Sequence, residues 1–472
     1  MLISLKVSNF RSIDSPIEFI MEASKETLRQ ERVADVAGNR VLQVSAIWGG
    51  NASGKSNFCE ALKYAQHLVV TGTRPDGPTG RVPFRLRKKA AEEATRFEFE
   101  IVVAEEAVEK LFRYVFAVDG RHVLEEKLIE VRPSSERVYF ERLSASDGEP
   151  RFTLMTCWER TSVSEEERMF AKFAARGTRS NQLFLHEAMD RKLEVIAPVF
   201  RWFRDQLVIL SPDSIAAPLE TAESGRDQVR NYITDLLRHA DTGITELRPV
   251  IIPVASLPIP SDMVEDINSK ITDESGVFLM APNGQRFTIF RKEGDLIASR
   301  IVSFRKSVEG EDVPFEMMDE SDGTVRLFDL APSFHDLGLP DSRKVYVIDE
   351  LDRSMHTHLA QSLLNLFFST RSRKTRSQLI FTTHDVNLLG QNLFRRDEIW
   401  FIGRAPSGAA EMESLSNYRE RHDKDIRKSY LEGRYSGVPN LKPFARSRVE
   451  EIEQPDLFLH TPRRGTSPAG AR

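Results

Sequence analysis

The feature that most constrains this sequence is a glycine-rich segment placed between two differently patterned stretches. Residues 49–56 read Gly-Gly-Asn-Ala-Ser-Gly-Lys-Ser and match G-x-x-x-x-G-K-[ST] in full. A β-rich run at 41–48 precedes the segment, and from Ser56 onward apolar residues recur at helical spacing as far as Val69. Strand, glycine turn and helix follow each other in the order that a phosphate-binding loop requires, so a chance match in a glycine-rich turn is the weaker interpretation.

The residues of this loop predict how a nucleoside triphosphate would be held. Glycines let the backbone approach phosphates that a Cβ would keep away, and N–H groups at the start of the helix point at the phosphate oxygens. Lys55 would place its charge on the β and γ phosphates, and the Ser56 hydroxyl can bind Mg²⁺. We therefore predict ATP and Mg²⁺ as cofactors, with a binding loop made of Gly49, Asn51, Ser53, Gly54, Lys55 and Ser56.

Two acidic residues follow the apolar run at 345–348. Asp349 is expected to hold Mg²⁺, directly or through water, because ligands collect at the carboxyl ends of parallel strands. Glu350 points differently and can polarise the attacking water as a positioned general base. An apolar run that ends in Asp-Glu is a weak signal alone, and it is the phosphate loop upstream that makes hydrolytic carboxylates the favoured interpretation.

Two further features can contribute to the same site. The apolar run at 379–383 ends at His384, which would bond a γ-phosphate or the attacking water if its strand neighbours that of Asp349. Ser321-Asp322-Gly323-Thr324 has the form of a Ser-x-Gly turn that opens a helix, where a hydroxyl and free N–H groups form an anion site. Each feature in isolation is more often a surface or capping group.

Together, these segments resemble the ABC-type ATPases of the SMC/RecF class. The signature motif of that class corresponds here to Ser321, Asp322, Gly323 and Thr324. Asp352 falls in the D-loop, His384 is the switch histidine, and Glu350 and His384 would be the catalytic residues. The resemblance implies that the signature of one subunit completes the nucleotide site of another, so that ATP joins two heads of a homo-oligomer. The sequence does not place a Q-loop glutamine.

More narrowly, the chain resembles the compact AAA-type ATPases of bacterial abortive-infection and anti-phage defence systems over residues 1–439. The segments that carry this resemblance are Asn9-Phe10-Arg11-Ser12, the glycine-rich loop extended to Asn57, Asp349-Glu350 followed by His356, Thr382-Thr383-His384, and residues 430–435. The resemblance adds Arg11 and Asn57 to the ATP-binding residues. The ATPase subunit of PARIS-type systems has a similar size and layout.

The defence resemblance implies a sensor or scaffold that controls a separate effector, such as a nuclease toxin, and that responds to a phage-encoded trigger. The stretch after His384 is too short for the nuclease domain of OLD-type relatives, which favours an effector in another polypeptide. The alternative is a DNA-repair or DNA-clamping ATPase like RecF, with DNA at the basic loop of Arg371, Arg373, Lys374 and Arg376. An ABC transporter motor fits poorly, because the insertion is unlike that of a transporter head.

The motifs predict an α/β fold: a P-loop ABC-type ATPase head with a mixed sheet, flanking helices, an antiparallel β-subdomain and an inserted, mainly helical or α+β domain. We place an N-terminal ATPase lobe at 1–144 and an insertion for partner or trigger recognition at 145–313. The C-terminal lobe, with the signature, the acids and His384, covers 314–440, and a partly disordered extension covers 441–472.

Bulk properties set the remaining limits. At 472 residues the chain exceeds one ordinary core, and a net charge of −5 gives no global attraction to nucleic acid. The two cysteines, Cys59 and Cys157, lack metal-ligand spacing and disfavour a disulfide framework. Neither a signal peptide nor a membrane span is evident, so a cytoplasmic location without a membrane partner is expected.

Overall fold

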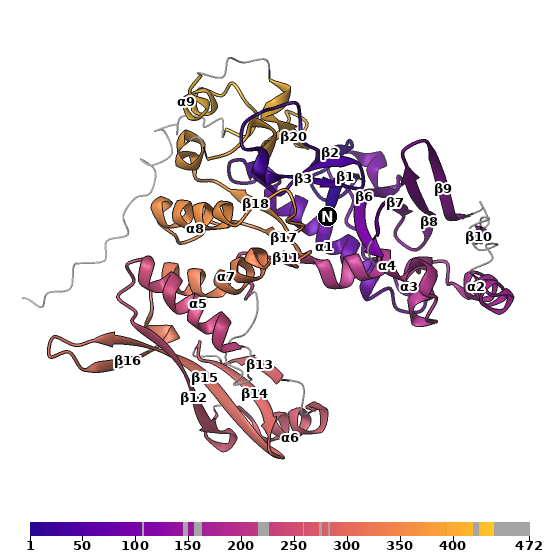
Figure 1. Cartoon of the computed structure of the whole chain (residues 1–472). Coiled ribbons are helices and arrows are strands. Elements are labelled where there is room, and N and C mark those ends of the chain that lie inside the picture. Colours follow the sequence, from indigo (N-terminus) through magenta and orange to yellow (C-terminus); the bar gives the residue numbers. More distant parts are fainter. Residues whose placement is uncertain are drawn as a thin grey trace, which may run out of the picture. The chain divides into compact units, whose positions relative to one another are not determined.

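A six-stranded sheet forms the framework of the computed structural model of this chain (Figure 1). Its strand order is β11 (Leu207–Leu210), β17 (Val345–Ile348), β18 (Gln378–Thr383), β5 (Val44–Trp48), β19 (Ile399–Arg404) and β20 (Ala410–Ser414). Neighbouring strands are parallel from β11 to β19, and β20 is antiparallel to β19. The apolar runs at 345–348 and 379–383 are therefore parallel strands, as predicted, and the run at 399–402 is another.

Both faces of this sheet are covered. Val347 packs in the hydrophobic core that contains α1 (Lys55–Val70), whereas its neighbour Ile348 packs in the core that contains α7 (Asp322–Gly338) and α8 (Thr357–Ser369). A strand buried on both faces needs apolar residues at nearly every position, which explains why these runs are continuous rather than alternating. The predicted helix after the glycine-rich loop is α1.

A second sheet is antiparallel and has seven strands. Its order is β10 (Pro150–Leu154), β9 (Ser135–Ser144), β8 (Val123–Arg132), β7 (Val108–Val118), β6 (Thr95–Glu105), β1 (Leu2–Ser8) and β2 (Ile17–Ile20). The N-terminal strand and the five strands between Thr95 and Leu154 all belong to it. This sheet is the predicted antiparallel β-subdomain, and its buried face packs in the core that contains α1.

The β-rich run at 41–48 is two strands instead of one. It divides at Gln43 into β4 (Asn39–Leu42), which pairs with β3 (Val33–Val36), and β5. The Gln43 side chain is fully buried and donates to the carbonyl oxygen of Ser372 at 2.5 Å. A buried amide needs such a partner, and this contact with a distant loop is one that a hydropathy pattern does not reveal.

The inserted region is α+β, which is one of the two alternatives predicted for it, and it is not mainly helical. Its helices include α2 (Glu165–Gly177), α3 (Phe184–Asp190), α4 (Ala197–Arg201), α5 (Arg226–His239) and α6 (Ser261–Lys270). Its antiparallel sheet has the order β12 (Glu246–Pro253), β15 (Asp295–Lys306), β14 (Arg286–Lys292) and β13 (Gly276–Met280), and β16 (Asp312–Glu316) also pairs with β15.

This sheet forms because apolar residues such as Phe287, Ile289 and Ala298 pack against Ile267 of α6 in a small core of their own. Figure 1 shows α5 beside α7, and the two helices are in contact. The domain boundaries stay a prediction. One strand of the central sheet, β11, comes from within 145–313, so that stretch also contributes to the ATPase lobe.

The structure describes residues 1–438 apart from 106–107, 145–149, 155–162, 216–225, 258, 273–275, 282–283, 392 and 419–423. The predicted extension at 441–472 and Cys157 lie outside the described residues. None of the helices in the described part has the length and hydropathy of a transmembrane span.

Candidate nucleotide site

The glycine-rich loop joins β5 to α1 in a conformation that its glycines permit. Gly54 has φ 112° and directly precedes the first residue of α1. A Cβ at Gly49 would lie 2.4 Å from the carbonyl oxygen of Ile402, and a Cβ at Gly54 would lie 2.9 Å from the Cβ of Ala410. The loop is therefore pressed against β19 and β20 at a distance that only glycine allows.

Lys55 connects this loop to the acids at the end of β17. Its ammonium is buried and donates to the carbonyl oxygens of Gly49, at 2.7 Å, and Gly50, at 3.0 Å. Burial lowers the pKa of Lys55 below its usual value, and the negative charges of Glu350 and Asp349 oppose that shift. The predicted phosphate-binding lysine and the predicted hydrolytic acids thus converge in space.

Thr382 of β18 holds both acids, a role that the sequence analysis did not assign. Its hydroxyl donates to Asp349 Oδ1 at 2.6 Å and accepts from the backbone N–H of Glu350 at 2.8 Å. Glu350 has φ 50°, a left-handed conformation that is uncommon for a residue other than glycine. The signal for this role was present, because Thr382 is a hydroxyl residue that directly follows the apolar run Leu379-Ile380-Phe381 in a fully buried strand.

His384 and Asp352 lie together, as their predicted roles require. Nδ1 of His384 is 3.6 Å from Asp352 Oδ2, at the end of β18. Asp352 is buried and its other oxygen, Oδ1, has no hydrogen-bond partner in the described structure. The His384 side chain is 57% exposed. A half-exposed imidazole beside a buried carboxylate is available to a ligand in a way that a purely structural histidine is not.

The predicted signature turn caps α7. The Ser321 hydroxyl accepts from the backbone N–H of Thr324 at 3.2 Å, while the side chains of Ser321 and Asp322 are exposed. Gly323 lies against the segment that follows Asp352, where an added Cβ would be 2.7 Å from the carbonyl oxygen of Ser354. The turn and the predicted D-loop are thus packed on each other within one chain.

Arg326, on the next turn of α7, is a second residue that the sequence analysis missed. Its guanidinium is buried and donates to the carbonyl oxygens of both Asp349 and Glu350 at 3.3 Å. Burial lowers the pKa of Arg326, and the nearby carboxylate of Asp329 opposes that shift. Arg326 therefore links the signature helix to the backbone of the hydrolytic acids.

The Asn-Phe-Arg-Ser segment lies beside the glycine-rich loop. Asn57 donates its side-chain amide to the Ser12 hydroxyl at 2.8 Å, and Arg11, which has φ 49°, pairs with Glu60 of α1 at 3.1 Å. Arg11, Ser12 and Asn57 border a recess of about 420 Å³. Its walls also include Ala52, Phe84, Leu86 and Arg404. The recess offers apolar surface and guanidinium groups next to the loop.

The segment 430–435 also supports the loop. Gly437, which follows it with φ 99°, accepts from the N–H of Gly50 at 2.7 Å and from the Tyr430 hydroxyl at 3.1 Å. Tyr435 stacks on Phe401 of β19 with ring centroids 4.8 Å apart. The glycine at 437 is required, because an added Cβ would lie 2.8 Å from the carbonyl oxygen of Ile402. The segment that suggested the defence class thus has a defined structural role.

The turn after β11 reaches the same edge of the central sheet. Leu210 accepts from the N–H of Asp349 at 2.9 Å, and Asp213 pairs with Arg353 at 2.6 Å. This turn, Ser211-Pro212-Asp213-Ser214, contains no glutamine. The turn therefore lies beside the segment of the hydrolytic acids and supplies no Q-loop glutamine, which the sequence did not place either.

The basic loop at 371–376 is largely structural. Arg371 is buried against backbone carbonyls, with its pKa lowered by burial to about 10. Arg376 pairs with Glu109 at 2.7 Å. Arg373 and Lys374 are the exposed members of the set. The cationic surface that this loop offers to DNA is correspondingly smaller than the sequence indicates.

The site combines a glycine-rich loop before α1, paired acids at the end of a parallel strand, a histidine after the adjacent strand and an exposed Ser-x-Gly turn. These features define a P-loop ATPase head of the ABC type. The chain belongs to the family described as "AAA domain, putative AbiEii toxin, Type IV TA system", whose model matches residues 44–390. The matched region includes the loop, Asp349, Glu350 and His384. The prediction of an SMC/RecF-like AAA ATPase of the abortive-infection class is confirmed.

Two solved structures are similar at low identity. An SMC head domain from Thermotoga maritima is 13% identical, with a TM-score of 0.36 and coverage of 88% of this chain and 98% of that chain. A crystal structure of the SmcHead bound to the C-winged helix domain of ScpA is 14% identical, with a TM-score of 0.38 and coverage of 88% and 97%. No curated protein matches the chain.

Proposed function

We propose that this chain binds ATP with Mg²⁺, hydrolyses it between two copies of itself, and uses that cycle to control a separate effector in anti-phage defence. The observation that carries the proposal is the convergence of Lys55 with Asp349 and Glu350 at one edge of the central sheet. Lysine for the phosphates and strand-end acids for the metal and the water are the parts that phosphoryl transfer to water needs.

The loop would hold the triphosphate through its backbone N–H groups and Lys55. The Ser53 hydroxyl is buried and has no hydrogen-bond partner in the described structure, so a phosphate oxygen would satisfy it. Lys55 already donates to two loop carbonyls and needs only to turn toward the β and γ phosphates. The recess beside Arg11 and Asn57 would receive the nucleoside, with Phe84 and Leu86 as apolar walls.

Asp349 and Glu350 would have different roles in hydrolysis. Ser56, which is exposed, and Asp349 would hold Mg²⁺, which when bound neutralises charge on the transferred phosphoryl group. Glu350 would orient the attacking water and accept its proton. His384, held beside Asp352, would contact the γ-phosphate end of the nucleotide. Thr382 and Arg326 would keep the backbone of the two acids in place.

A second copy of the chain would close the site. Ser321 and Asp322 are exposed at the start of α7, a helix of 17 residues, and are free to face another subunit. The Ser321 hydroxyl and the N–H groups of that first turn suit a γ-phosphate, because a helix start favours negative charge. The proposed assembly is thus a head-to-head homo-oligomer in which ATP is shared between subunits.

The family description supports the biological part of the proposal, because it places the chain among AbiEii-type proteins of toxin–antitoxin systems. We assign effector control and the response to a phage-encoded trigger to the inserted α+β region, which ATP chemistry does not require. A DNA-clamping role is the second candidate. It rests on Arg373 and Lys374 alone, because the other two basic side chains of that loop are engaged.

ATP affinity of two lysine variants tests the site. Lys55→Ala should abolish ATP binding measured by titration calorimetry, since it removes the charge at the phosphates. Lys63→Ala is the matched control, because Lys63 lies on the same helix with its side chain 56% exposed, and it should bind as the wild type does. Retained affinity in Lys55→Ala would refute the nucleotide site. In a separate experiment, a neighbouring gene product that copurifies with the chain only when ATP binding is intact would support effector control.

A further inference from the structure

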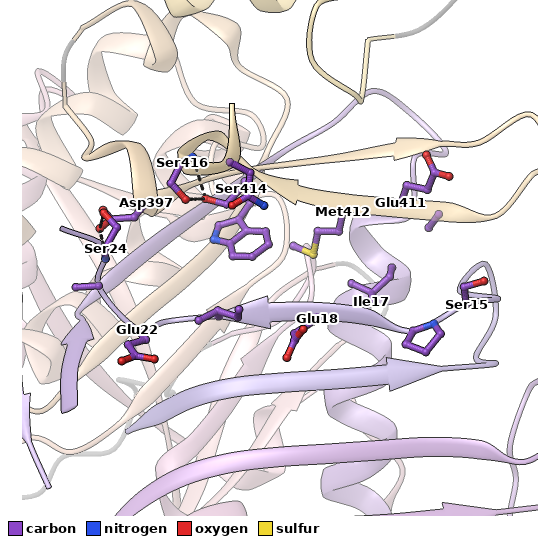
Figure 2. A pocket seen from close by; sticks show the side chains of 16 residues that line it. Ser15, Ile17, Glu18, Glu22, Ser24, Asp397, Glu411, Met412, Ser414 and Ser416 are labelled. Atoms are coloured by element: carbon purple, nitrogen blue, oxygen red, sulfur yellow. Dashed lines mark hydrogen bonds between the residues drawn. The ribbon is translucent and has the colours of Figure 1, made fainter. Parts of the chain in front are cut away.

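A groove runs between the edge strands of the two large sheets (Figure 2). β2 is the last strand of the antiparallel sheet and β20 the last strand of the central sheet. The groove has a volume of about 580 Å³, and its apolar part is formed by Ile17, Ile20, Trp400 and Met412. It includes none of the residues assigned above to the nucleotide.

The β20 side of the groove presents backbone hydrogen-bonding groups. Ala410 donates its N–H to the carbonyl oxygen of Ser12 at 2.7 Å, on the side away from β19. Backbone groups of an antiparallel strand alternate in direction, so the N–H and C=O of Met412 point the same way as those of Ala410. In the described part of the chain, no strand pairs with β20 on that side. Ser12 occupies this edge at Ala410 and β2 also contacts β20, so the part of the edge that can accept a short extended segment is at Met412, which lines the groove.

The charge around the groove has a single sign. Glu18 and Glu22 lie on the β2 side and Glu411 on the β20 side, and all three are exposed (Figure 2). No lysine or arginine is among the residues that line the groove. Lys6 is 3.5 Å from Glu18, and Asp397 is neutralised by Arg395 at 2.7 Å. Glu22 and Glu411 therefore carry most of the negative charge, which would repel the phosphates of a nucleic acid.

We propose that this groove binds an extended segment of a partner protein that bears lysine or arginine at alternate positions and adds as a strand to the β20 edge. Main-chain hydrogen bonds along Met412 would supply affinity, as in other cases of strand addition. Alternate side chains would then face the apolar floor and the glutamates, because side chains of a strand alternate between two faces. The proposal is independent of the nucleotide chemistry.

A labelled synthetic peptide of alternating Lys and Val residues tests the proposal by fluorescence anisotropy with the full chain. We expect Glu22→Lys/Glu411→Lys to weaken binding by about tenfold or more, because two attractions become repulsions. Glu309→Lys/Glu311→Lys is the matched control. It reverses the same number of exposed acids in the turn between β15 and β16 and should leave affinity unchanged.

A second probe separates strand addition from simple charge attraction. The same peptide N-methylated at alternate residues keeps its charge but loses half of its backbone donors, and it should also bind about tenfold more weakly. Equal affinity of the two peptides would overturn strand addition. Equal losses in the groove and control variants would mean that the peptide responds to the overall charge of the chain and not to this groove. Unchanged binding in the groove variant would mean that the glutamates merely protect an exposed edge from aggregation.

Discussion

Arg305 of β15 donates two hydrogen bonds, of 2.7 and 2.6 Å, to the carboxylate of Glu320, the residue that precedes Ser321. The Ser303 hydroxyl donates to the same carboxylate at 2.5 Å, and the Glu320 side chain is 1% exposed. Farther along α7, Arg286 of β14 pairs with Asp329. The inserted sheet is thus bonded both to the residue before the proposed signature turn and to the middle of α7, which would give a partner bound to that sheet a physical route to the proposed nucleotide site.

Removal of the Arg305–Glu320 contact should uncouple the signature turn from the inserted sheet. We expect Arg305→Ala to lower kcat for ATP hydrolysis with little change in the KM for ATP, because the loop of Lys55 is untouched. It should also destabilise the chain by about 3 kcal/mol, since it leaves a buried carboxylate unpaired. Arg305→Ala/Glu320→Gln should recover most of the stability, measured by denaturant unfolding, without recovering kcat.

Lys306→Ala is the control for that experiment. Lys306 follows Arg305 on the same strand but pairs with Asp312 at the surface, with its side chain 56% exposed. Its loss should cost less than about 1 kcal/mol and leave hydrolysis unchanged. A wild-type kcat in Arg305→Ala would show that the contact only supports the fold.

Glu350→Gln should separate ATP binding from hydrolysis. The amide keeps the size of the side chain but cannot accept a proton, so we expect kcat to fall by about 100-fold or more while ATP affinity is retained. The variant should accumulate the assembled form with ATP, detected by light scattering after size-exclusion chromatography. If the size-exclusion profile of Glu350→Gln is the same with and without ATP, either ATP does not join the heads or the protein is assembled constitutively. The size-exclusion profile of Lys55→Ala distinguishes these two cases.

Thr382→Val tests whether one hydroxyl positions both acids. The substitution removes the donor to Asp349 and the acceptor of the Glu350 N–H, and we expect kcat to fall by about tenfold or more and the Mg²⁺ requirement to rise. Stability should fall by about 1–3 kcal/mol, because a buried N–H loses its partner. Thr383→Val, at the next buried position of β18, removes a hydroxyl that accepts from the Asp385 N–H and has no other side-chain hydrogen bond among the described residues, and it should keep the wild-type Mg²⁺ dependence.

The sequence could predict those parts of the molecule in which local pattern and site chemistry coincide. The glycine-rich loop, the acids after 345–348 and His384 come from segments whose order implies their position on a parallel sheet. Thr382 and Arg326 escaped prediction because their roles depend on which strands and helices become neighbours. Nothing local indicates that Arg326 will reach the carbonyl of Glu350.

The errors in the fold prediction have similar physical causes. Gln43 interrupts a β-rich run because its amide bonds to a loop far along the chain, which no alternation pattern can show. The sequence left the insertion open between mainly helical and α+β, because β12 and β15 become strands through pairing with each other. Strand propensity depends on such partners more than helix propensity does.

Stability should depend on pH through Glu398, which is fully buried between Arg32 and the backbone N–H of Arg395. Burial raises the pKa of Glu398 from 4.5 to about 7. The folded state therefore holds an extra proton between these two values, so the free energy of unfolding should fall as pH rises from 4.5 to 7, by an amount on the order of 3 kcal/mol. Glu398→Gln should flatten this part of the profile, measured by denaturant unfolding across the pH range. The exposed Glu309→Gln should leave the slope unchanged, and equal slopes in wild type and Glu398→Gln would mean that Arg32 keeps the carboxylate ionised throughout.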